Sequence, residues 1–135
     1  MELKNKMKTA KKTQYALRAM LFIAKQNEIV CSLRFISEEE NISLAYLEKI
    51  FSMLEKKDLV ISKRGAMGGY VLSRLPNKIT LKDIFDAVEE EISIVECLNK
   101  SCPRDNICMA SSAWREINGK IEKSLSLIKL SDLLK

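Results

Sequence analysis

Histidine is absent from this chain of 135 residues, and the common catalytic motifs are absent with it. There is no imidazole to act as a general base, no Walker phosphate-binding loop, no nucleophile elbow and no redox C-x-x-C pair. The stretch RGAMGGY contains glycines but lacks the spacing of a dinucleotide-binding loop. These absences argue against an enzyme.

The sequence also lacks a hydrophobic run long enough to span a bilayer. The basic start MELKNKMKTAKK leads into LRAMLFIAKQ, which is too short for a membrane helix and has no small-residue cleavage site after it. Hydrophobic residues make up 47% of the chain and charged residues 30%, which is the balance of a globular protein. We expect a cytoplasmic protein with a single core and no membrane partner.

Positive charge is concentrated in the N-terminal half. Residues 1–74 contain 14 Lys and Arg against 8 Asp and Glu, whereas residues 75–135 contain 9 against 10. A basic half on an ordinary globular core is typical of a protein with a phosphate-rich partner, although many basic proteins bind no nucleic acid.

Helical periodicity predicts three helices in the first 58 residues. The first runs to about Lys25 with Thr13 as its N-cap, and a short second helix follows Ser37, because the acids in EEEN suit a first helical turn. It stops near Asn41, and Ser43 caps a third helix over LAYLEKIFSMLEKKD. Two helices joined by so short a turn predict a helix-turn-helix.

The third helix has one apolar stripe and one polar face. Such a helix packs its stripe on the core and leaves the other face for solvent or a ligand. The stripe consists of Leu44, Leu47, Ile50, Phe51 and Leu54, and the residues expected outside it are Ala45, Tyr46, Glu48, Lys49 and Ser52.

The stretch LVISKRGAMGGYVLS predicts a β-hairpin, because β-branched and apolar runs flank a turn that contains three glycines. A hairpin after a helix-turn-helix is typical of a wing. Arg64 beside Gly65 at a narrow tip fits the minor groove of DNA, where the negative potential is enhanced. For the hairpin alone, a solvated turn arginine remains the alternative.

These blocks together resemble a known family. The run ISLAYLEKIFSMLEKKDLVISKRGAMGGYVLS, followed by ITLKDIFDAVEE and a cysteine triplet, is similar to the Rrf2 family of bacterial winged-helix transcription regulators, in particular to its IscR-like members. The resemblance implies a mainly α fold with a small β-hairpin wing and a long C-terminal dimerisation helix. It also implies a homodimer that binds a partly palindromic DNA operator. We expect residues 1–80 to form the DNA-binding domain and residues 81–135 to carry the cluster-binding loop and the dimerisation helices.

A long amphipathic helix near the C-terminus supports the dimer independently of the family. A helix of this length needs more apolar cover than its own domain offers, and an isologous interface uses one patch twice. The alternative is a helix lying on its own domain. The expected interface residues recur at spacings of three and four: Trp114, Ile117, Ile121, Leu125 and Ile128.

Base contacts are expected from the exposed face at the start of the third helix, because N-terminal residues of a recognition helix meet base edges. Ala45 offers a methyl group to thymine, Glu48 accepts from a cytosine amine, and Lys49 donates to guanine or to a phosphate. The expected DNA-binding residues are Ala45, Tyr46, Glu48, Lys49, Arg64 and Gly65, with Lys4, Lys6, Lys8, Lys11, Lys12 and Lys63 on the phosphate backbone.

Three thiols lie within CLNKSCPRDNIC, with four residues between the first two and five between the second and third. Cys97, Cys102 and Cys108 match the position where IscR-like members bind an iron-sulfur cluster, [2Fe-2S] or [4Fe-4S], and soft thiolate ligands suit such a cluster. Zinc is a rival, but structural zinc sites usually have four ligands and close cysteine pairs. A cluster-free thiol switch between Cys97 and Cys102, or three unliganded cysteines, are further alternatives.

The fourth cluster ligand departs from the family pattern. Many IscR-like proteins have a histidine where this chain has Ser111, and other members use a carboxylate of the partner's first helix where this chain has Gln14. Asp105, Ser111, one of Glu89 to Glu91 or an exogenous small molecule are candidates. Cys31, between the first two helices, is expected in the core.

The sequence therefore predicts a DNA-binding transcription regulator whose operator binding is controlled by an iron-sulfur cluster. A cluster-free regulator with a thiol switch or a small-molecule effector, for example in cysteine metabolism, is the alternative. A small iron-sulfur electron-transfer protein is the alternative of a different class, but it would not need the helix pair and the wing.

Overall fold

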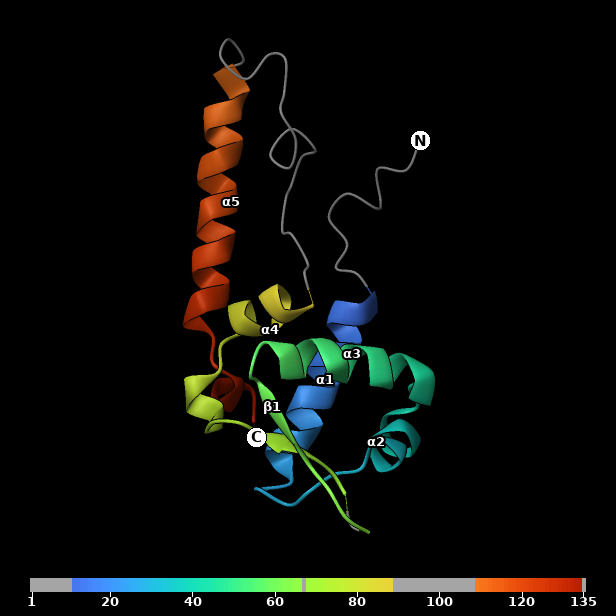
Figure 1. Ribbon diagram of the computed structural model, residues 1–135. Helices are drawn as coiled ribbons and strands as arrows, with labels where there is room; N and C mark the ends of the chain where they lie inside the picture. Colours follow the sequence, from blue (N-terminus) through green and yellow to red (C-terminus); the bar gives the residue numbers. More distant parts are fainter. Residues whose placement is uncertain (1–10, 67, 89–108, 135) are drawn as a thin grey trace.

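The computed structural model describes residues 11–66, 68–88 and 109–134 (Figure 1). Within these ranges the fold is mainly helical with one antiparallel hairpin, as expected. The elements in chain order are α1 (Lys11–Lys25), α2 (Leu33–Glu40), α3 (Leu44–Lys56), β1 (Val60–Lys63), β2 (Gly69–Leu72), the 3-10 turn η2 (Pro76–Lys78), α4 (Leu81–Ala87), α5 (Met109–Leu127) and the 3-10 turn η4 (Leu130–Leu133).

Helices α2 and α3 form the helix-turn-helix. Helix α2 ends at Asn41, which takes a left-handed conformation (φ 55°, ψ 49°) that asparagine tolerates better than most residues. Two residues later, the Ser43 hydroxyl oxygen accepts a hydrogen bond from the Tyr46 backbone N–H at 3.3 Å and caps α3. The predicted end of the second helix and the predicted cap of the third are both confirmed.

Two predicted N-caps are wrong. Helix α1 already includes Lys11, so Thr13 lies inside it with its side chain buried. Helix α2 begins at Leu33, because extended Ser32 accepts a hydrogen bond from the Phe35 N–H at 3.1 Å. Ser37 therefore lies within α2, where its hydroxyl donates to the Ile42 carbonyl oxygen at 2.5 Å.

The hydrophobic core lies between α1, α3 and the segments that follow the wing. Four apolar residues of α3 are fully buried in it, whereas Leu44 of the predicted stripe is half-buried. The same core includes α4 and the chain just after α5. Its main members are Ala16, Ala19, Met20 and Ile23 of α1, Leu47, Ile50, Phe51 and Leu54 of α3, and Ile79, Ile84, Val88 and Leu130.

The wing is paired on both edges of β2. Strand β1 pairs with β2 in antiparallel register, from Val60 opposite Leu72 to Lys63 opposite Gly69. On the other edge, Cys31 and Tyr70 exchange two backbone hydrogen bonds of 3.0 and 2.8 Å. A Cβ atom at Gly69 would lie 2.2 Å from the Cys31 carbonyl oxygen, so only glycine allows this close approach.

Helix α5 projects away from the rest of the described structure, as Figure 1 shows. It packs against α4, and the chain after its C-terminal end is anchored by backbone hydrogen bonds. The Leu81 N–H donates to the Ile128 carbonyl oxygen at 3.0 Å, and the Leu130 N–H donates to the Ile79 carbonyl oxygen at 2.8 Å. The orientation of α5 is therefore set at its base.

The base of α5 and helix α4 share the core of the winged portion, since Ile84 and Leu130 belong to the same buried cluster as α1 and α3. The expected division of the chain into residues 1–80 and 81–135 stays a prediction. Among the described residues, no helix is both long enough and apolar enough to cross a bilayer.

Candidate nucleic-acid interface

Helix α3 exposes the residues that were expected to read bases. Ala45, Glu48, Lys49 and Ser52 are all exposed, one turn or less apart, on the side opposite the buried stripe. The Ser43 cap fixes the start of the helix, so the first exposed turn has a defined backbone. This surface offers a methyl group, a carboxylate acceptor and an ammonium donor, which are the groups that bind base edges in the major groove.

Tyr46 differs from the expectation that it lies outside the packed face. It is half-buried, and its ring meets the edge of the Tyr15 ring with 5.2 Å between centroids and an angle of 81°. The charged ends of Lys11 and Arg18 lie 5.9 and 5.7 Å from the centre of the Tyr15 ring. Tyr46 thus packs α3 on α1, and only part of its side chain is left for DNA.

The tip of the wing is exposed and positively charged. Lys63, Arg64, Gly65 and Ala66 are all exposed. Gly65 has φ 114°, a conformation that other residues rarely adopt, and its carbonyl oxygen accepts from the Gly68 N–H at 3.0 Å to close the turn. The predicted pair Arg64 and Gly65 therefore sits at a tight tip with the guanidinium free of an ion pair among the described residues.

A side-chain contact links the wing to α3, and sequence reasoning missed it. The Ser62 hydroxyl donates to Glu55 Oε2 at 3.1 Å, which connects β1 to the C-terminal half of α3. The Tyr70 ring of β2 lies against Phe51 of α3, with 4.9 Å between centroids. Burial raises the pKa of the Tyr70 phenol, and the carboxylates of Glu55 and Glu48 raise it further, so the phenol is neutral at physiological pH. No sequence pattern indicates contacts of this kind.

The predicted cluster ligands lie outside the described residues. This holds for Cys97, Cys102 and Cys108 and for the candidate fourth ligands Asp105 and Glu89 to Glu91. Within the residues that are described, no group of three or more carboxylates and thiols is close enough to hold a metal ion. Lys4, Lys6 and Lys8 also lie outside the described part, whereas Lys11 and Lys12 open α1.

Two candidate fourth ligands do lie within the described part. Ser111 is in the first turn of α5, with only 5% of its surface exposed, and its hydroxyl oxygen accepts from Arg115 Nη1 at 3.4 Å. Gln14 is exposed on α1. Ser111 is thus already engaged by a cation, and both positions supply uncharged oxygen atoms where a cluster favours an anion.

The predicted dimer residues form a partly uncovered stripe on α5 and just after it. Ile117 is 43% exposed, and Trp114, Ile121, Leu125 and Ile128 are half-buried. The amide oxygen of Asn118, which lies on the same stripe, is shielded from solvent and has no hydrogen-bond partner in this chain among the described residues. A single chain therefore leaves both apolar and polar groups of this helix unsatisfied.

Cys31 is a core residue, as expected. It is 2% exposed, its thiol donates to the Ile29 carbonyl oxygen at 3.5 Å, and burial raises the pKa of the thiol. Burial therefore favours the neutral thiol over the thiolate. The thiolate is the form that acts as a nucleophile or a metal ligand. Cys31 is thus separated in role from the three cysteines of the CLNKSCPRDNIC stretch.

The raised pKa of Cys31 leads to a pH prediction. A folded pKa above the unfolded value of about 8.5 stabilises the fold at lower pH, and this contribution is lost as pH rises through the folded pKa. In a background with Cys97, Cys102 and Cys108 replaced by serine, urea unfolding of Cys31 and Cys31→Ala proteins should differ more at pH 7 than at pH 10. If the two proteins differed equally in unfolding free energy at both pH values, the raised pKa of the Cys31 thiol would be contradicted.

Comparison with known proteins places this geometry in a family. The family model for Rrf2, described as an iron-dependent transcriptional regulator, matches residues 9–135. The HTH-type transcriptional regulator IscR of Xenorhabdus nematophila is 37% identical over 131 residues, which cover 96% of this chain and 80% of that protein.

Two solved structures are similar to the whole described fold. The structure of IscR from T. potens has a TM-score of 0.77 and 32% identity, over 93% of this chain and 85% of that one. The structure of CymR, the global cysteine regulator of B. subtilis, has a TM-score of 0.76 and 37% identity, over 93% of this chain and 95% of that one. With a winged helix-turn-helix that exposes a basic tip and a polar helix face, this chain belongs to the Rrf2 family and is a transcription regulator, not an enzyme.

Proposed function

We propose that a cytoplasmic homodimer of this chain binds a double-stranded DNA operator, and that an iron-sulfur cluster held by Cys97, Cys102 and Cys108 controls its affinity. In this proposal the N-terminal half of α3 enters the major groove and the wing tip enters the minor groove. The observation that carries the DNA-binding part is the exposed face of α3 beside a basic hairpin that is joined to it through Ser62 and Glu55.

The dimer is supported by α5. The helix projects from the body with an exposed isoleucine on one stripe, and the shielded amide oxygen on that stripe has no partner among the residues that the structure describes. A second copy of the same helix offers apolar cover and hydrogen-bond donors by symmetry, and it spaces two wings along one side of DNA.

The donor set supports iron-sulfur chemistry. Three thiolates are the ligands that such clusters take in proteins, and the chain contains no histidine that would complete a zinc site. The cluster would supply a redox-sensitive iron centre that is lost or altered by oxygen, nitric oxide or a change in iron supply. The stretch that carries the thiols connects α4 to α5 in the sequence, so a cluster there would act on the junction between the winged portion and α5.

A cluster-free regulator is the second candidate, and similarity to CymR favours it. CymR is the global cysteine regulator of B. subtilis, and its 37% identity to this chain equals that of IscR from Xenorhabdus nematophila. In that case Cys97 and Cys102 would form a reversible disulfide, with an oxidant as the signal. Iron and sulfide content of protein prepared without oxygen distinguishes the two candidates.

Operator binding is tested by removing single cations. On a DNA fragment selected by the wild-type protein from a random pool, Arg64→Ala and Lys49→Ala should each weaken binding by about 1–3 kcal/mol, or roughly 5- to 150-fold, because each removes a groove contact. The matched control is Lys120→Ala, since the Lys120 side chain is 76% exposed on α5, far along the chain from the α3 and wing residues of the proposed DNA interface. Measurement is by fluorescence anisotropy at fixed, moderate salt, because phosphate contacts depend on salt. Equal affinity of Arg64→Ala and wild type would place the wing outside the groove.

A further inference from the structure

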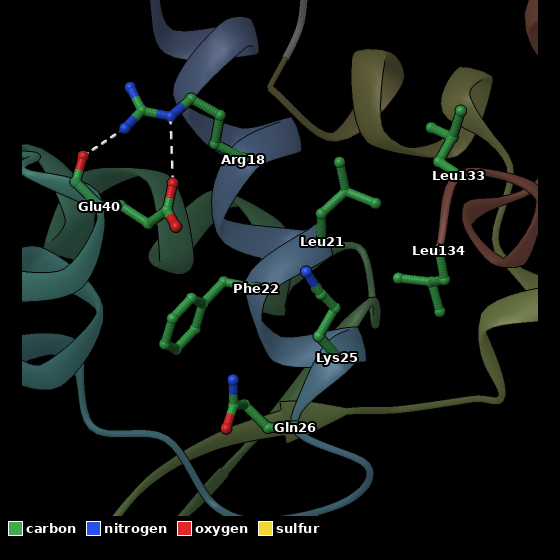
Figure 2. A pocket seen from close by; sticks show the side chains of 8 residues that line it. All are labelled: Arg18, Leu21, Phe22, Lys25, Gln26, Glu40, Leu133 and Leu134. Carbon is green, nitrogen blue, oxygen red and sulfur yellow. Dashed lines mark hydrogen bonds and ion pairs between the residues drawn. The ribbon is translucent and has the colours of Figure 1, made fainter.

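A pocket along α1 is lined by residues that take no part in the proposed DNA interface. It has a volume of about 450 Å³ and lies between α1, the end of α2 and the C-terminal segment (Figure 2). This volume is in the range of pockets that bind small organic molecules. Neither the expected DNA contacts nor the expected cluster ligands include any of its lining residues.

The walls combine apolar groups with an excess of positive charge. Leu21 of α1 faces Leu133 and Leu134 of the C-terminal segment across the pocket, whereas the Phe22 ring points to the other side of α1, as Figure 2 shows. The Lys25 side chain extends between Phe22 and Leu134. An occupant between Leu21 and the two C-terminal leucines would therefore contact aliphatic carbon on two sides.

The charged groups leave one cation unpaired. Arg18 Nε lies 3.2 Å from Glu40 Oε1, and a second guanidinium nitrogen donates to the Glu40 backbone carbonyl. Lys25, by contrast, has no ion pair or hydrogen bond recorded within residues 11–66, 68–88 and 109–134. Lys25 suits the C-terminal end of a helix dipole, but that role does not require its side chain to line a pocket.

The Arg18–Glu40 pair is open to competition by an anion. Its side chains are 45% and 27% exposed, and ion pairs with that degree of solvent contact contribute little to stability. A carboxylate with two oxygen atoms can accept from the guanidinium and from the Lys25 ammonium together. Among the described lining residues, two cations against one carboxylate thus favour a ligand with a single negative charge.

The pocket touches both parts of the molecule that determine how DNA is bound. Glu40 directly precedes Asn41, the left-handed residue that ends α2 in the helix-turn-helix. Leu133 and Leu134 belong to the segment that follows α5, and that segment is held to the core through Leu130. A ligand here bridges the helix-turn-helix to the base of α5.

We propose that this pocket binds a small monocarboxylate with an apolar body, and that binding changes affinity for the operator. The carboxylate lies between Arg18 and Lys25, and the apolar body packs against Leu21 and the two C-terminal leucines. Binding in the pocket does not depend on the proposed function, whereas the effect on DNA affinity rests on it. By linkage, the operator changes affinity for the ligand by the same factor.

The probe for the pocket is 3-phenylpropionate, with 3-phenylpropionamide as the uncharged control of the same shape. A ligand of this size is expected to bind with Kd about 1 mM, measured by NMR titration of the full-length protein. The acid should bind about tenfold more tightly than the amide. Equal binding of acid and amide, or no binding of the acid at about ten times that concentration, would overturn the proposal.

Two lysine variants locate the binding site. Lys25→Met keeps the apolar stem and removes the charge. It should therefore weaken binding of the acid about fivefold or more and leave binding of the amide unchanged. Lys78→Met is the control, because Lys78 is exposed on η2 outside the pocket. Both variants should retain the wild-type circular dichroism spectrum. Equal loss of acid binding in both variants would assign the effect to general charge and overturn the site.

The coupling is measured separately as the affinity for the selected DNA fragment with and without saturating 3-phenylpropionate. A change of about fivefold or more, absent in Lys25→Met, supports it. Binding of the probe with no change in DNA affinity would overturn the coupling. A protein that binds the probe but no DNA at all would instead refute the proposed function and leave the pocket assignment standing.

Discussion

Gly69→Ala should lower the free energy of unfolding by about 3 kcal/mol, which corresponds to a fall in Tm of roughly 10 °C. The added Cβ would lie 2.2 Å from the Cys31 carbonyl oxygen and 2.4 Å from its carbonyl carbon. These are backbone atoms, so no side-chain rotation relieves the contact and β2 must move away from Cys31. Urea and thermal unfolding followed by circular dichroism measure the loss.

The matched control is Gly65→Ala at the tip of the same wing. No atom lies within 4 Å of the added Cβ there, so the cost is limited to the positive φ of 114°. This substitution should cost about 1 kcal/mol. If Gly69→Ala were no more harmful than Gly65→Ala, the close approach of β2 to Cys31 would be wrong.

Gly69→Ala should also reduce affinity for DNA. Strand β2 is held by β1 on one edge and by Cys31 on the other, so the wing has a fixed direction relative to α1 and α3. Releasing the Cys31 edge leaves the hairpin attached to α3 through the Ser62 contact to Glu55 and the packing of Tyr70 on Phe51. A two-stranded hairpin is marginally stable alone, and a mobile wing loses more entropy when it enters a groove.

Ile121→Asp should dissociate the proposed dimer, with an increase in the dimer dissociation constant of about 1,000-fold or more. An isologous interface contains the substitution twice, and each copy places an unpaired carboxylate among apolar groups. Ile121 lies midway along the stripe between Trp114 and Ile128, so in the proposed interface the charge is far from either end of the stripe. Sedimentation equilibrium over a concentration series measures the effect.

Ser126→Asp provides the control for added charge. Ser126 is exposed on the same helix, and its hydroxyl donates to the Lys123 carbonyl oxygen at 2.7 Å within its own chain. It lies well away from Ile121 around the helix axis, because five residues correspond to about 140° of rotation. The control should stay dimeric. A wild-type protein that sediments as a monomer, or an Ile121→Asp variant as dimeric as the control, would refute the interface.

Asn118 gives the interface a polar element. Its amide oxygen is shielded from solvent without a partner in the described part of the chain. Buried polar groups without hydrogen bonds are costly, and a single polar residue in an apolar helix seam is a known way to fix register. A partner helix that donates a hydrogen bond to this oxygen would remove the cost and select one alignment of the two α5 helices.

Local patterns in the sequence were sufficient for most of the fold. The apolar stripe of α3 predicted which residues are buried, and Ser43 and Asn41 marked the ends of the turn, because caps and amphipathic faces are properties of adjacent residues. The first cap of α2 was missed, since the acids after Ser37 looked like a first turn and are in fact the last one. Ser32, which is an equally good capping residue, is the actual N-cap.

The contacts that position the candidate interface are between distant segments, and no periodicity reveals them. The Cys31–Tyr70 bridge joins residues 39 positions apart by backbone groups that every residue has. The Tyr15–Tyr46 and Arg18–Glu40 contacts depend on how α1 crosses the helix-turn-helix. For that reason Tyr46 was expected on the exposed face and is half-buried instead.

The most direct test of the proposed control is operator affinity of protein prepared without oxygen, compared between its cluster-loaded and metal-free forms. Iron and sulfide are assayed in the same samples, and protein with Cys97, Cys102 and Cys108 replaced by serine is the control. We expect iron and sulfide in the wild type alone and affinities that differ about tenfold or more between its two forms. Iron-free wild-type protein, or equal affinity of the two forms, would contradict control by a cluster.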